Sequence, residues 1–293
     1  MIDLHIHTEY SRDADRSVEY IFSRCSDLGI KAAALTDHNM VAANEEGEAL
    51  AGGFGIDFIP GIEMDTVFGG TIFHLLGYFI DYRSDDFESL YKRACRAELE
   101  VFPKMIDKLK DIGFEISWDE VLKAADGGQP AEAMISNLIV RNPVNAERGL
   151  SVPYLDGGGR SDMPDFNFYF DYLAPGNAAF SLRDYIPLEE AVALIKRNGG
   201  VAVLAHPGSN LTEGDPLMGG IIDCGIDGIE AYSSYHKAGE NGYYAGIAEK
   251  AGLLATCGSD FHGPFKPAIS LGGHGCPVDG NDILKALKTL AGR

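Results

Sequence analysis

The feature that most constrains the fold is a repeated alternation between short apolar runs and helical patterns. Seven runs rich in β-branched or apolar residues end abruptly in polar residues, at 2–7, 32–38, 58–63, 71–79, 201–206, 228–232 and 253–260. This rhythm is typical of βα units, which build a parallel barrel or sheet. The 293 residues allow one α/β barrel, which commonly takes about 250 residues, or two ordinary domains.

Two helices carry clear start and stop signals. In 17–28, apolar residues recur at spacings of 3, 4, 7 and 10, and Gly29 follows, so this segment is predicted to be an amphipathic helix. Before the fifth run, Pro187 marks a helix start, 189–196 continues the pattern, and Gly199 and Gly200 end it.

The interval 83–184 does not keep the alternation and is expected to be a mainly helical insertion. It therefore divides the predicted barrel into 1–82 and 185–293. Helices are predicted at 87–112, 118–125 and 131–140, followed by a loop-like stretch that includes an exposed, mobile loop at 151–165. The aromatic segment FNFYFDYL, residues 166–173, is expected to pack in the core of this small domain or also to line a ligand pocket.

Charge and composition exclude several classes of protein. A composition that is 45% hydrophobic excludes a disordered or fibrous chain. With 24 Lys and Arg against 44 Asp and Glu, the net charge is −20, which argues against a partner such as duplex nucleic acid. The N-terminal segment lacks the features of a signal peptide, no apolar run is long enough to span a membrane, and the five cysteines form no CxxC pair. We expect a cytoplasmic protein with reduced thiols.

The candidate chemistry lies at the ends of the predicted strands. His5 and His7 close the first strand and point to one face, because side chains alternate with a period of two. Six of the eight histidines lie at or in predicted strands, together with acidic residues; the set is His5, His7, Asp37, His38, Glu63, His74, His206, Asp260 and His262, with Asp13 nearby. In a parallel barrel these strand ends meet at one rim.

A lone histidine is more often a structural group than a ligand, but so many imidazoles and carboxylates at one rim are hard to explain as packing. Such ligands suit Zn, Mn, Fe or Mg, and they exceed what one tetrahedral ion needs. We therefore predict a site of two or three divalent metal ions. Paired cations generate a nucleophile from water and hold phosphoryl oxygens, so hydrolysis of a phosphate ester is the expected reaction.

Seven motifs in this order carry a family resemblance: DLHIHTEYSRD, ALTDHN, IPGIEMD, HLLGYF, VLAHPG, GIEAYSS and GSDFHG. Over about 1–82 and 185–265 the chain resembles the polymerase-and-histidinol-phosphatase (PHP) family of the amidohydrolase superfamily. The resemblance implies an α/β fold, a distorted seven-stranded (β/α)7 barrel, with two or three divalent metals and phosphoesterase activity. The motif forms and the insertion look most like the branch that includes 3′,5′-nucleotide bisphosphate phosphatases and cyclic phosphodiesterases.

The same resemblance assigns roles to individual residues. One metal is expected on His5, His7, Glu63 and Asp260, and Glu63 should bridge to a second metal held by His74. A third metal is expected on Asp13, His38 and His262, with Asp15 as the alternative to Asp13, because relatives often read SDG where this chain reads Ser11-Arg12-Asp13. His206 should ligate metal or lie beside it, and His206 and Asp260 are the predicted catalytic residues.

Substrate recognition is less well defined by the motifs. Relatives often carry basic residues in the insertion where this chain has Asn137 and Asn177, so the candidate substrate-binding residues are Arg12, Arg141, Arg160 and Lys266. The expected substrate is a small phosphorylated metabolite, a nucleotide or sugar phosphate that includes a cyclic phosphodiester or a 3′,5′-bisphosphate, attacked by a metal-bound hydroxide and selected by the insertion. Alternatives are a noncatalytic metal-bound PHP module in an assembly and a C–N amidohydrolase. The oligomeric state is left open.

Overall fold

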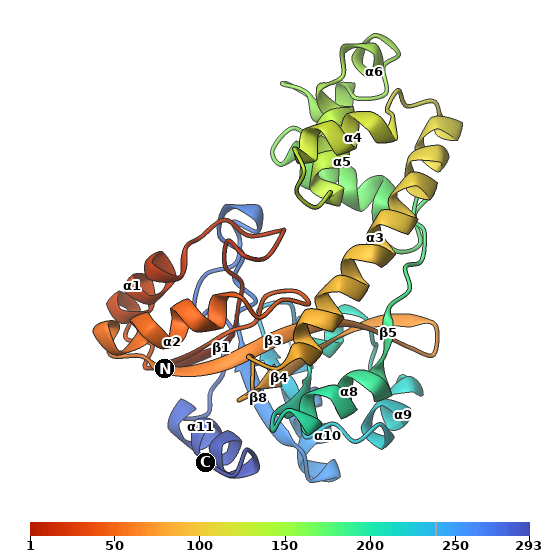
Figure 1. Ribbon diagram of the computed structural model, residues 1–293. Helices are drawn as coiled ribbons and strands as arrows, with labels where there is room; N and C mark the ends of the chain where they lie inside the picture. Colours follow the sequence, from red (N-terminus) through yellow and green to blue (C-terminus); the bar gives the residue numbers. More distant parts are fainter. Residues whose placement is uncertain (238) are drawn as a thin grey trace. The chain divides into compact units, whose positions relative to one another are not determined.

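The computed structural model describes residues 1–237 and 239–293 and divides into two compact units. The first unit comprises Met1–Tyr91 and Tyr185–Arg293, and the second comprises Lys92–Asp184. Helix α3 (Asp85–Ile112), the long helix in Figure 1, crosses from one unit into the other. The division therefore falls inside this helix, nine residues beyond the boundary placed after residue 82.

The first unit is a nearly closed barrel (Figure 1). Its strands follow the order β1 (Ile2–Ile6), β2 (Ala32–Leu35), β3 (Asp57–Phe68), β4 (Thr71–Tyr78), β6 (Val201–Leu204), β7 (Gly228–Ser233) and β8 (Leu254–Gly258), while the short β5 (Ile186–Pro187) pairs with the far end of β3. Backbone hydrogen bonds from His7 N to Phe261 O (2.9 Å) and from Asp260 N to His5 O (2.8 Å) join the two ends of the sheet. The predicted seven-stranded α/β barrel is confirmed.

One strand runs against the parallel arrangement that the alternation predicted. β3 continues past Glu63 to Phe68, and β4 returns antiparallel to it and also pairs antiparallel with β6. The turn between them is Gly69-Gly70, both with positive φ (57° and 81°), which is the two-residue glycine connection that a tight hairpin requires. His74 consequently lies within a hairpin, opposite Asp65, and not at the carboxyl end of a parallel strand.

Helices of the first unit follow the barrel strands. They are α1 (Val18–Leu28), α2 (Ala43–Phe54), α8 (Leu188–Arg197), α9 (Leu217–Asp223), α10 (Glu240–Ala251) and α11 (Gly280–Leu290), with 3₁₀ turns η3 (Pro207–Ser209) and η4 (Gly263–Phe265). The Ser17 side chain caps α1 by accepting the N–H of Tyr20, and Gly29, with φ 74°, ends the helix. α8 begins directly after Pro187, the residue that the sequence marked as the helix start.

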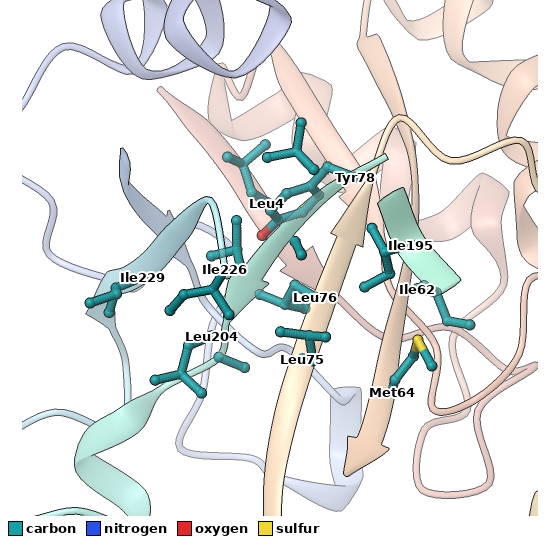
Figure 2. Close-up of a cluster of buried hydrophobic side chains, with 14 of the residues drawn as sticks. Leu4, Ile62, Met64, Leu75, Leu76, Tyr78, Ile195, Leu204, Ile226 and Ile229 are labelled. Carbon is teal, nitrogen blue, oxygen red and sulfur yellow. The ribbon is translucent and has the colours of Figure 1, made fainter. Parts of the chain in front are cut away.

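The barrel core is filled by aliphatic side chains from the strands and the covering helices (Figure 2). Leu4, Ile62 and Leu76 are fully buried strand residues, and Ile195 of α8 packs against the same sheet. Each such side chain contributes about 1.5–3 kcal/mol of transfer free energy to folding. This packing holds the strand ends in register, and the site depends on that register.

The second unit is helical and has a core of its own. It contains most of α3 with α4 (Trp118–Ala125), α5 (Glu132–Arg141), α6 (Pro143–Glu147), η1 (Val152–Tyr154), α7 (Pro164–Phe168) and the π-helical turn η2 (Tyr169–Leu173). The prediction of a loop-like end is wrong at 164–173, because Pro164 starts a helix whose Phe168 and Leu173 are buried against Phe114 and Ile135. Phe170 on the same turn is 49% exposed.

The cysteines and the helix lengths bear on two expectations from the sequence, reduced thiols and the lack of a membrane span. All five cysteines are free thiols. Among the helices that the structure describes, none combines the length and apolarity needed to cross a membrane.

Candidate metal centre

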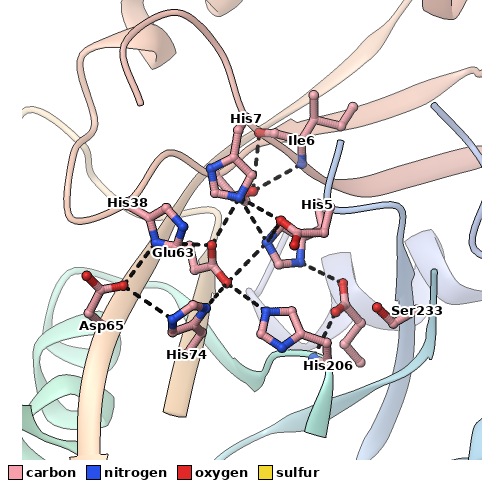
Figure 3. A network of polar contacts seen from close by, with 12 residues as sticks. His5, Ile6, His7, His38, Glu63, Asp65, His74, His206 and Ser233 are labelled. Atoms are coloured by element: carbon pink, nitrogen blue, oxygen red, sulfur yellow. Dashed lines mark hydrogen bonds and ion pairs between the residues drawn. The ribbon is translucent and has the colours of Figure 1, made fainter. Parts of the chain in front are cut away.

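Histidines and carboxylates of the first unit gather at one rim of the barrel (Figure 3). His5 in β1 and His7 just after it are both fully buried and point to the same side, and their Nε2 atoms lie 3.3 Å apart. Asp260, which follows β8, places Oδ1 at 3.1 Å from His5 Nε2 and 2.8 Å from His7 Nε2. Residues from opposite ends of the chain thus share one small volume.

Glu63 lies at the centre of this group. It is buried on β3, and its two carboxylate oxygens face different histidines. Oε1 lies 3.2 Å from His5 Nε2, 2.9 Å from His74 Nδ1 and 3.2 Å from His206 Nε2, while Oε2 lies 3.0 Å from His7 Nε2 and 3.3 Å from His38 Nδ1. A carboxylate with imidazole nitrogens on both oxygens has the arrangement of a ligand that bridges two ions.

The orientation of the rings shows that the cluster fits divalent cations. The Nδ1 atoms of four histidines are held from behind: His5 by Glu230, His7 by the Ser11 hydroxyl, His38 by Asp65 and His262 by the carbonyl of Asp260. A carboxylate or carbonyl oxygen accepts, so three of these contacts place a proton on Nδ1, and the Ser11 hydroxyl, which donates its own proton to Asp13 at 2.7 Å, accepts from His7 in the same way. The Nε2 atoms are left to face the cluster.

The Nε2 atoms of these rings face carboxylate oxygens of the cluster. Glu63 Oε2, Asp260 Oδ1 and His262 Nε2 are buried atoms without a hydrogen-bond partner. The donors of a tetrahedral ion bonded at about 2.1 Å lie roughly 3.4 Å apart, which is close to the separations found here. A cation between them would satisfy every one of these atoms.

The donor atoms form overlapping groups in which all ligand atoms lie within 4.8 Å of one another. The groups are His5, His7, Glu63 and Asp260; Glu63, His74 and His206; His7, Asp13, His38 and His262; and His38, Asp65 and His74. The first three correspond to the three expected ligand sets. Imidazole nitrogens together with carboxylate oxygens are a donor set that fits divalent metal ions.

Asp13 and Asp15, the two alternatives for the third set, lie in different surroundings. Asp13 Oδ2 is 3.0 Å from His262 Nε2 and 3.6 Å from His38 Nε2. Asp15 is exposed and pairs with its neighbour Arg16 at 3.5 Å. Of the two, Asp13 is the carboxylate that lies beside the histidines of the cluster.

The acidic ligands are held in the ionised form. Burial raises the pKa of Glu63, but the facing His5, His38 and His74 outweigh it and keep that pKa well below its usual value. Asp260 behaves in the same way: burial raises its pKa, and Lys266 and His5 more than reverse the effect. Both carboxylates are thus ready to bind a cation at neutral pH.

The imidazoles divide into two kinds. Burial lowers the pKa of His262 to about 4, so this ring is neutral and able to ligate at physiological pH. For His38, burial also lowers the pKa, but Glu63, Asp65 and Asp13 raise it further, to about 10. A cation that binds His38 must therefore displace a proton.

His206 and Asp260 share an unusual backbone conformation. Both have positive φ, 21° for His206 and 56° for Asp260, which is uncommon for residues with a Cβ atom. Each directly follows a barrel strand or its extension, where the chain turns sharply. Strain of this kind persists where surrounding contacts hold it, and it concentrates at functional sites.

Sequence reasoning missed two acidic residues at the site. Asp65 accepts a hydrogen bond from His38 Nδ1 at 2.9 Å and one from the Asn39 amide at 2.8 Å. Glu230, fully buried on β7, contacts His5 Nδ1 at 2.9 Å. A signal existed for both: Asp65 lies two residues beyond Glu63 on the same face of β3, and Glu230 is an acidic residue inside an otherwise apolar strand.

The four basic candidates for substrate binding lie in two places. Lys266 and Arg12 belong to the first unit, and the Lys266 ammonium lies 3.3 Å from Asp260 Oδ2 and 5.3 Å from the ring centre of Tyr235. In the second unit, Arg141 pairs with Asp165 at 2.8 Å and Arg160 pairs with Asp171 at 2.6 Å. To bind a phosphate, either of these arginines must share its guanidinium with a carboxylate.

A further group, Cys257, His274 and Cys276, lies outside this cluster. His274 Nε2 donates to the carbonyl of Ile2 at 2.9 Å, and its Nδ1 accepts the N–H of Cys276 at 3.1 Å. Both ring nitrogens are already engaged with the backbone. His274 is therefore structural.

Comparison with known proteins supports the class that this geometry indicates. Residues 3–125 match the PHP domain. The chain is 30% identical over 276 residues to a 3′,5′-nucleoside bisphosphate phosphatase of Chromobacterium violaceum, which covers 92% of this chain and 90% of the relative. It is 26% identical to a phosphoribosyl 1,2-cyclic phosphate 1,2-diphosphodiesterase of Eggerthella lenta (90% and 94% covered) and 28% identical to the 5′-3′ exoribonuclease Rnm of Salmonella typhimurium (92% and 87% covered).

A solved structure shows the same fold. The crystal structure of a proposed metal-dependent phosphoesterase from Bifidobacterium adolescentis matches with a TM-score of 0.75 over 98% of this chain and 95% of that chain, at 23% identity. A nearly closed α/β barrel with this cluster of ligands, and with these relatives, defines a hydrolase of phosphoric esters. The chain belongs to the PHP family.

Proposed function

We propose that this PHP protein hydrolyses a phosphate ester bond of a small phosphorylated metabolite, a nucleotide or a sugar phosphate, at a centre of two or three divalent ions. The observation that carries the proposal is the set of imidazole nitrogens and carboxylate oxygens that converge around the buried Glu63, each group of ligand atoms within 4.8 Å of one another. Relatives named for a nucleoside bisphosphate and for a cyclic sugar phosphate support the substrate class.

In this proposal the residues form three ligand sets. His5, His7, Glu63 and Asp260 hold one ion; Glu63, His74 and His206 hold a second; and Asp13, His38 and His262, beside His7, hold a third. When bound, such ions polarise phosphoryl oxygens and generate a nucleophile from water near neutral pH. His206 and Asp260 are assigned as the catalytic ligands, and both lie on turns with positive φ beside the other ligands.

Lys266 is the basic residue that the geometry favours for the phosphate. Its side chain is 20% exposed, and it is tethered to the outer oxygen of Asp260, whose inner oxygen faces His5 and His7. The ammonium has three N–H bonds, and the contact to Asp260 uses one of them. Lys266 can therefore hold a phosphoryl oxygen beside the metals while it keeps Asp260 in place.

The charge of the chain favours small substrates. At −20, the protein repels long polyanions, and this repulsion grows with the number of phosphates near the surface. A metabolite with one or two phosphates meets mainly the local positive charge of the centre. The named relatives include an exoribonuclease, so short and long substrates must be compared directly.

The test uses protein that has been freed of metal and then reloaded with Mn²⁺ or Zn²⁺. It is assayed with a nucleoside 3′,5′-bisphosphate, a cyclic sugar phosphodiester and a 5′-phosphorylated oligoribonucleotide, with a His7→Ala variant as the control for contaminating phosphatases. We expect kcat/KM to be highest for one of the small substrates and to require added metal. Best cleavage of the oligoribonucleotide would contradict the proposed substrate class, and full metal loading without hydrolysis of any ester would instead indicate a noncatalytic module.

A further inference from the structure

Behind the ligand cluster, a single carboxylate connects two of the proposed metal ligands. Glu230 lies in the middle of β7, a strand whose six residues are all buried, and its side chain is fully enclosed. Its Oε1 lies 2.9 Å from His5 Nδ1, and its Oε2 accepts the backbone N–H of His206 at 2.9 Å. Glu230 itself does not belong to any of the groups whose donor atoms converge on a cation position.

We propose that Glu230 is a positioning residue of the metal centre, which fixes the His5 ring with Nε2 toward Glu63 and Asp260 and holds the backbone turn at His206. This inference rests on the metal centre proposed above. It concerns how the ligands are held and makes no claim about which ester is cleaved.

The contact with His5 determines which ring nitrogen is available. A carboxylate oxygen accepts, so the contact with Glu230 holds a proton on Nδ1 of His5 and leaves Nε2 as the ring nitrogen that faces the cluster. Nε2 lies 3.2 Å from Glu63 Oε1 and 3.1 Å from Asp260 Oδ1. Without Glu230, the ring is free to carry its proton on Nε2, and that proton would block the position of the cation.

The contact with His206 holds a strained turn. His206 has φ 21° and ψ 59°, a conformation that is unfavourable for a residue with a Cβ atom. Its ring lies 3.2 Å from Glu63 Oε1 through Nε2, so the direction of the ring depends on this turn. By accepting the N–H of His206, Glu230 stabilises the backbone from which a ligand of the second ion projects.

The surroundings of Glu230 leave little freedom. A Cβ atom at Gly258 of β8 would lie 2.5 Å from Glu230 Oε1 and 2.2 Å from the Cβ of His5, so only glycine allows the β8 backbone to pass this close. The carboxylate of Glu230 is therefore confined between β1 and β8. Its side chain has no room to move to other hydrogen-bond partners.

The isosteric variant Glu230→Gln separates positioning from packing. An amide has one accepting oxygen and one donating NH₂ group, whereas His5 Nδ1–H and His206 N–H both require an acceptor. One of the two contacts must fail although the shape is unchanged. Asp3→Asn is the matched control, because Asp3 is also fully buried and lies on β1, but its hydrogen bonds go to the backbone N–H groups of His5, Ser259 and Gly272 and not to an imidazole ring.

The experiment measures Zn²⁺ affinity by competition with a chelating dye, without substrate. We expect Glu230→Gln to weaken the binding of at least one zinc ion by about 10–100-fold. Glu230→Asp, which keeps two accepting oxygens, should bind more tightly than Glu230→Gln, and Asp3→Asn should stay within about threefold of the wild type. In zinc-loaded wild-type protein, ¹⁵N-histidine NMR should show a proton on His5 Nδ1 and none on Nε2.

Three results would overturn the inference about Glu230. They are wild-type zinc affinity in Glu230→Gln, equal losses of affinity in Glu230→Gln and Asp3→Asn, and a proton on Nε2 of zinc-loaded His5. If Glu230→Gln does not fold, the wild-type NMR measurement and Glu230→Asp still test it. A wild-type protein that binds no zinc would instead refute the proposed metal centre, so the two failures are distinguishable.

Discussion

At the scale of single residues, the site is defined by which ring nitrogen of each histidine faces the carboxylates. His7 shows this most clearly: Ser11 holds its Nδ1 at 3.3 Å, and the Ser11 hydroxyl in turn donates to Asp13 at 2.7 Å. Nε2 of His7 then faces Glu63 and Asp260. Burial lowers the pKa of this ring, but hydrogen bonds to Asp260 and Glu63 raise it above its usual value, so a cation that binds Nε2 competes with a proton there.

Removal of a central ligand should abolish function without unfolding the barrel. We expect His7→Ala and Asp260→Ala to lose about one bound ion per chain and to lower kcat/KM at least roughly 100-fold, because a cation loses a direct ligand. Elemental analysis and phosphate release measure both effects, and circular dichroism checks the fold. Asp15→Ala, an exposed residue paired with Arg16, serves as the control and should match the wild type. Wild-type turnover in both ligand variants would refute the assignment.

Metal binding should release protons at neutral pH. In the metal-free protein, the acidic neighbours of His38 outweigh burial and raise its pKa to about 10, so this ring is protonated at pH 7, whereas His262, with a pKa of about 4, is not. Metal affinity should therefore rise with pH up to about 10. The pKa of His38 is higher in the folded protein than its unfolded value of about 6.5. The His38 ion pairs therefore stabilise the metal-free fold fully below about pH 6.5, and this stabilisation is lost as the pH rises toward 10.

Calorimetric titration of the metal in two buffers with different ionisation enthalpies measures the released protons. We expect the apparent enthalpies at pH 7 to differ by an amount that corresponds to at least one proton for the ion that binds His38. Identical enthalpies in both buffers would show that the ring is neutral before metal arrives.

At the scale of elements, the site depends on how closely the first and last strands approach each other. Gly258 of β8 lies against His5, and a methyl group there would come within 2.2 Å of the Cβ of His5. Gly258→Ala should separate β8 from β1, lower the free energy of unfolding by about 1–3 kcal/mol and weaken metal binding. Gly52→Ala is the matched control: nothing lies within 4 Å of its added methyl group, and Gly52 is inside α2, so alanine should stabilise by up to about 1 kcal/mol.

Denaturant unfolding and dye competition compare the two alanine variants. Opposite signs of the change in stability are expected, with weaker metal binding only in Gly258→Ala. Equal effects would mean that close contact between β1 and β8 does not hold the ligands.

The elements also show what could be predicted from sequence. All seven main strands were found because each is a short apolar run bounded by polar residues, but this pattern carries no direction. The antiparallel β4 follows from the turn at Gly69-Gly70, a local signal whose weight is clear only once β3 is seen to extend to Phe68. The same extension explains why Asp65 was missed: it lies beyond the predicted end of the strand at Glu63.

The site residues were predictable to different degrees for a physical reason. Ligands such as His5 and His262 are polar residues directly after apolar runs, so they stand out. Glu230 lies inside an apolar strand, and its role depends on contact with residues 225 and 24 positions away. Long-range partners of this kind are set by the closure of the barrel, which no local pattern encodes.

At the scale of the whole molecule, the two units have separate hydrophobic cores. The core of the second unit is built only from residues between Val101 and Phe180, and it includes contacts of Trp118 with Phe102. All proposed metal ligands belong to the first unit. Bound ions should therefore stabilise the first unit and leave the intrinsic stability of the second unchanged.

The single tryptophan makes this division measurable. Trp118 lies in α4 of the second unit, so its fluorescence reports unfolding there, whereas circular dichroism reports both units. A ligand that binds only the folded state adds a free energy of RT ln(1 + [L]/Kd), about 2.7 kcal/mol when its concentration is 100 times Kd. We expect a chelator to lower the Tm seen by circular dichroism by several degrees, while the Trp118 transition moves by less than about 2 °C. Parallel shifts of both signals would show that the two units unfold as one cooperative body, and no shift in either would contradict a metal centre that stabilises the barrel.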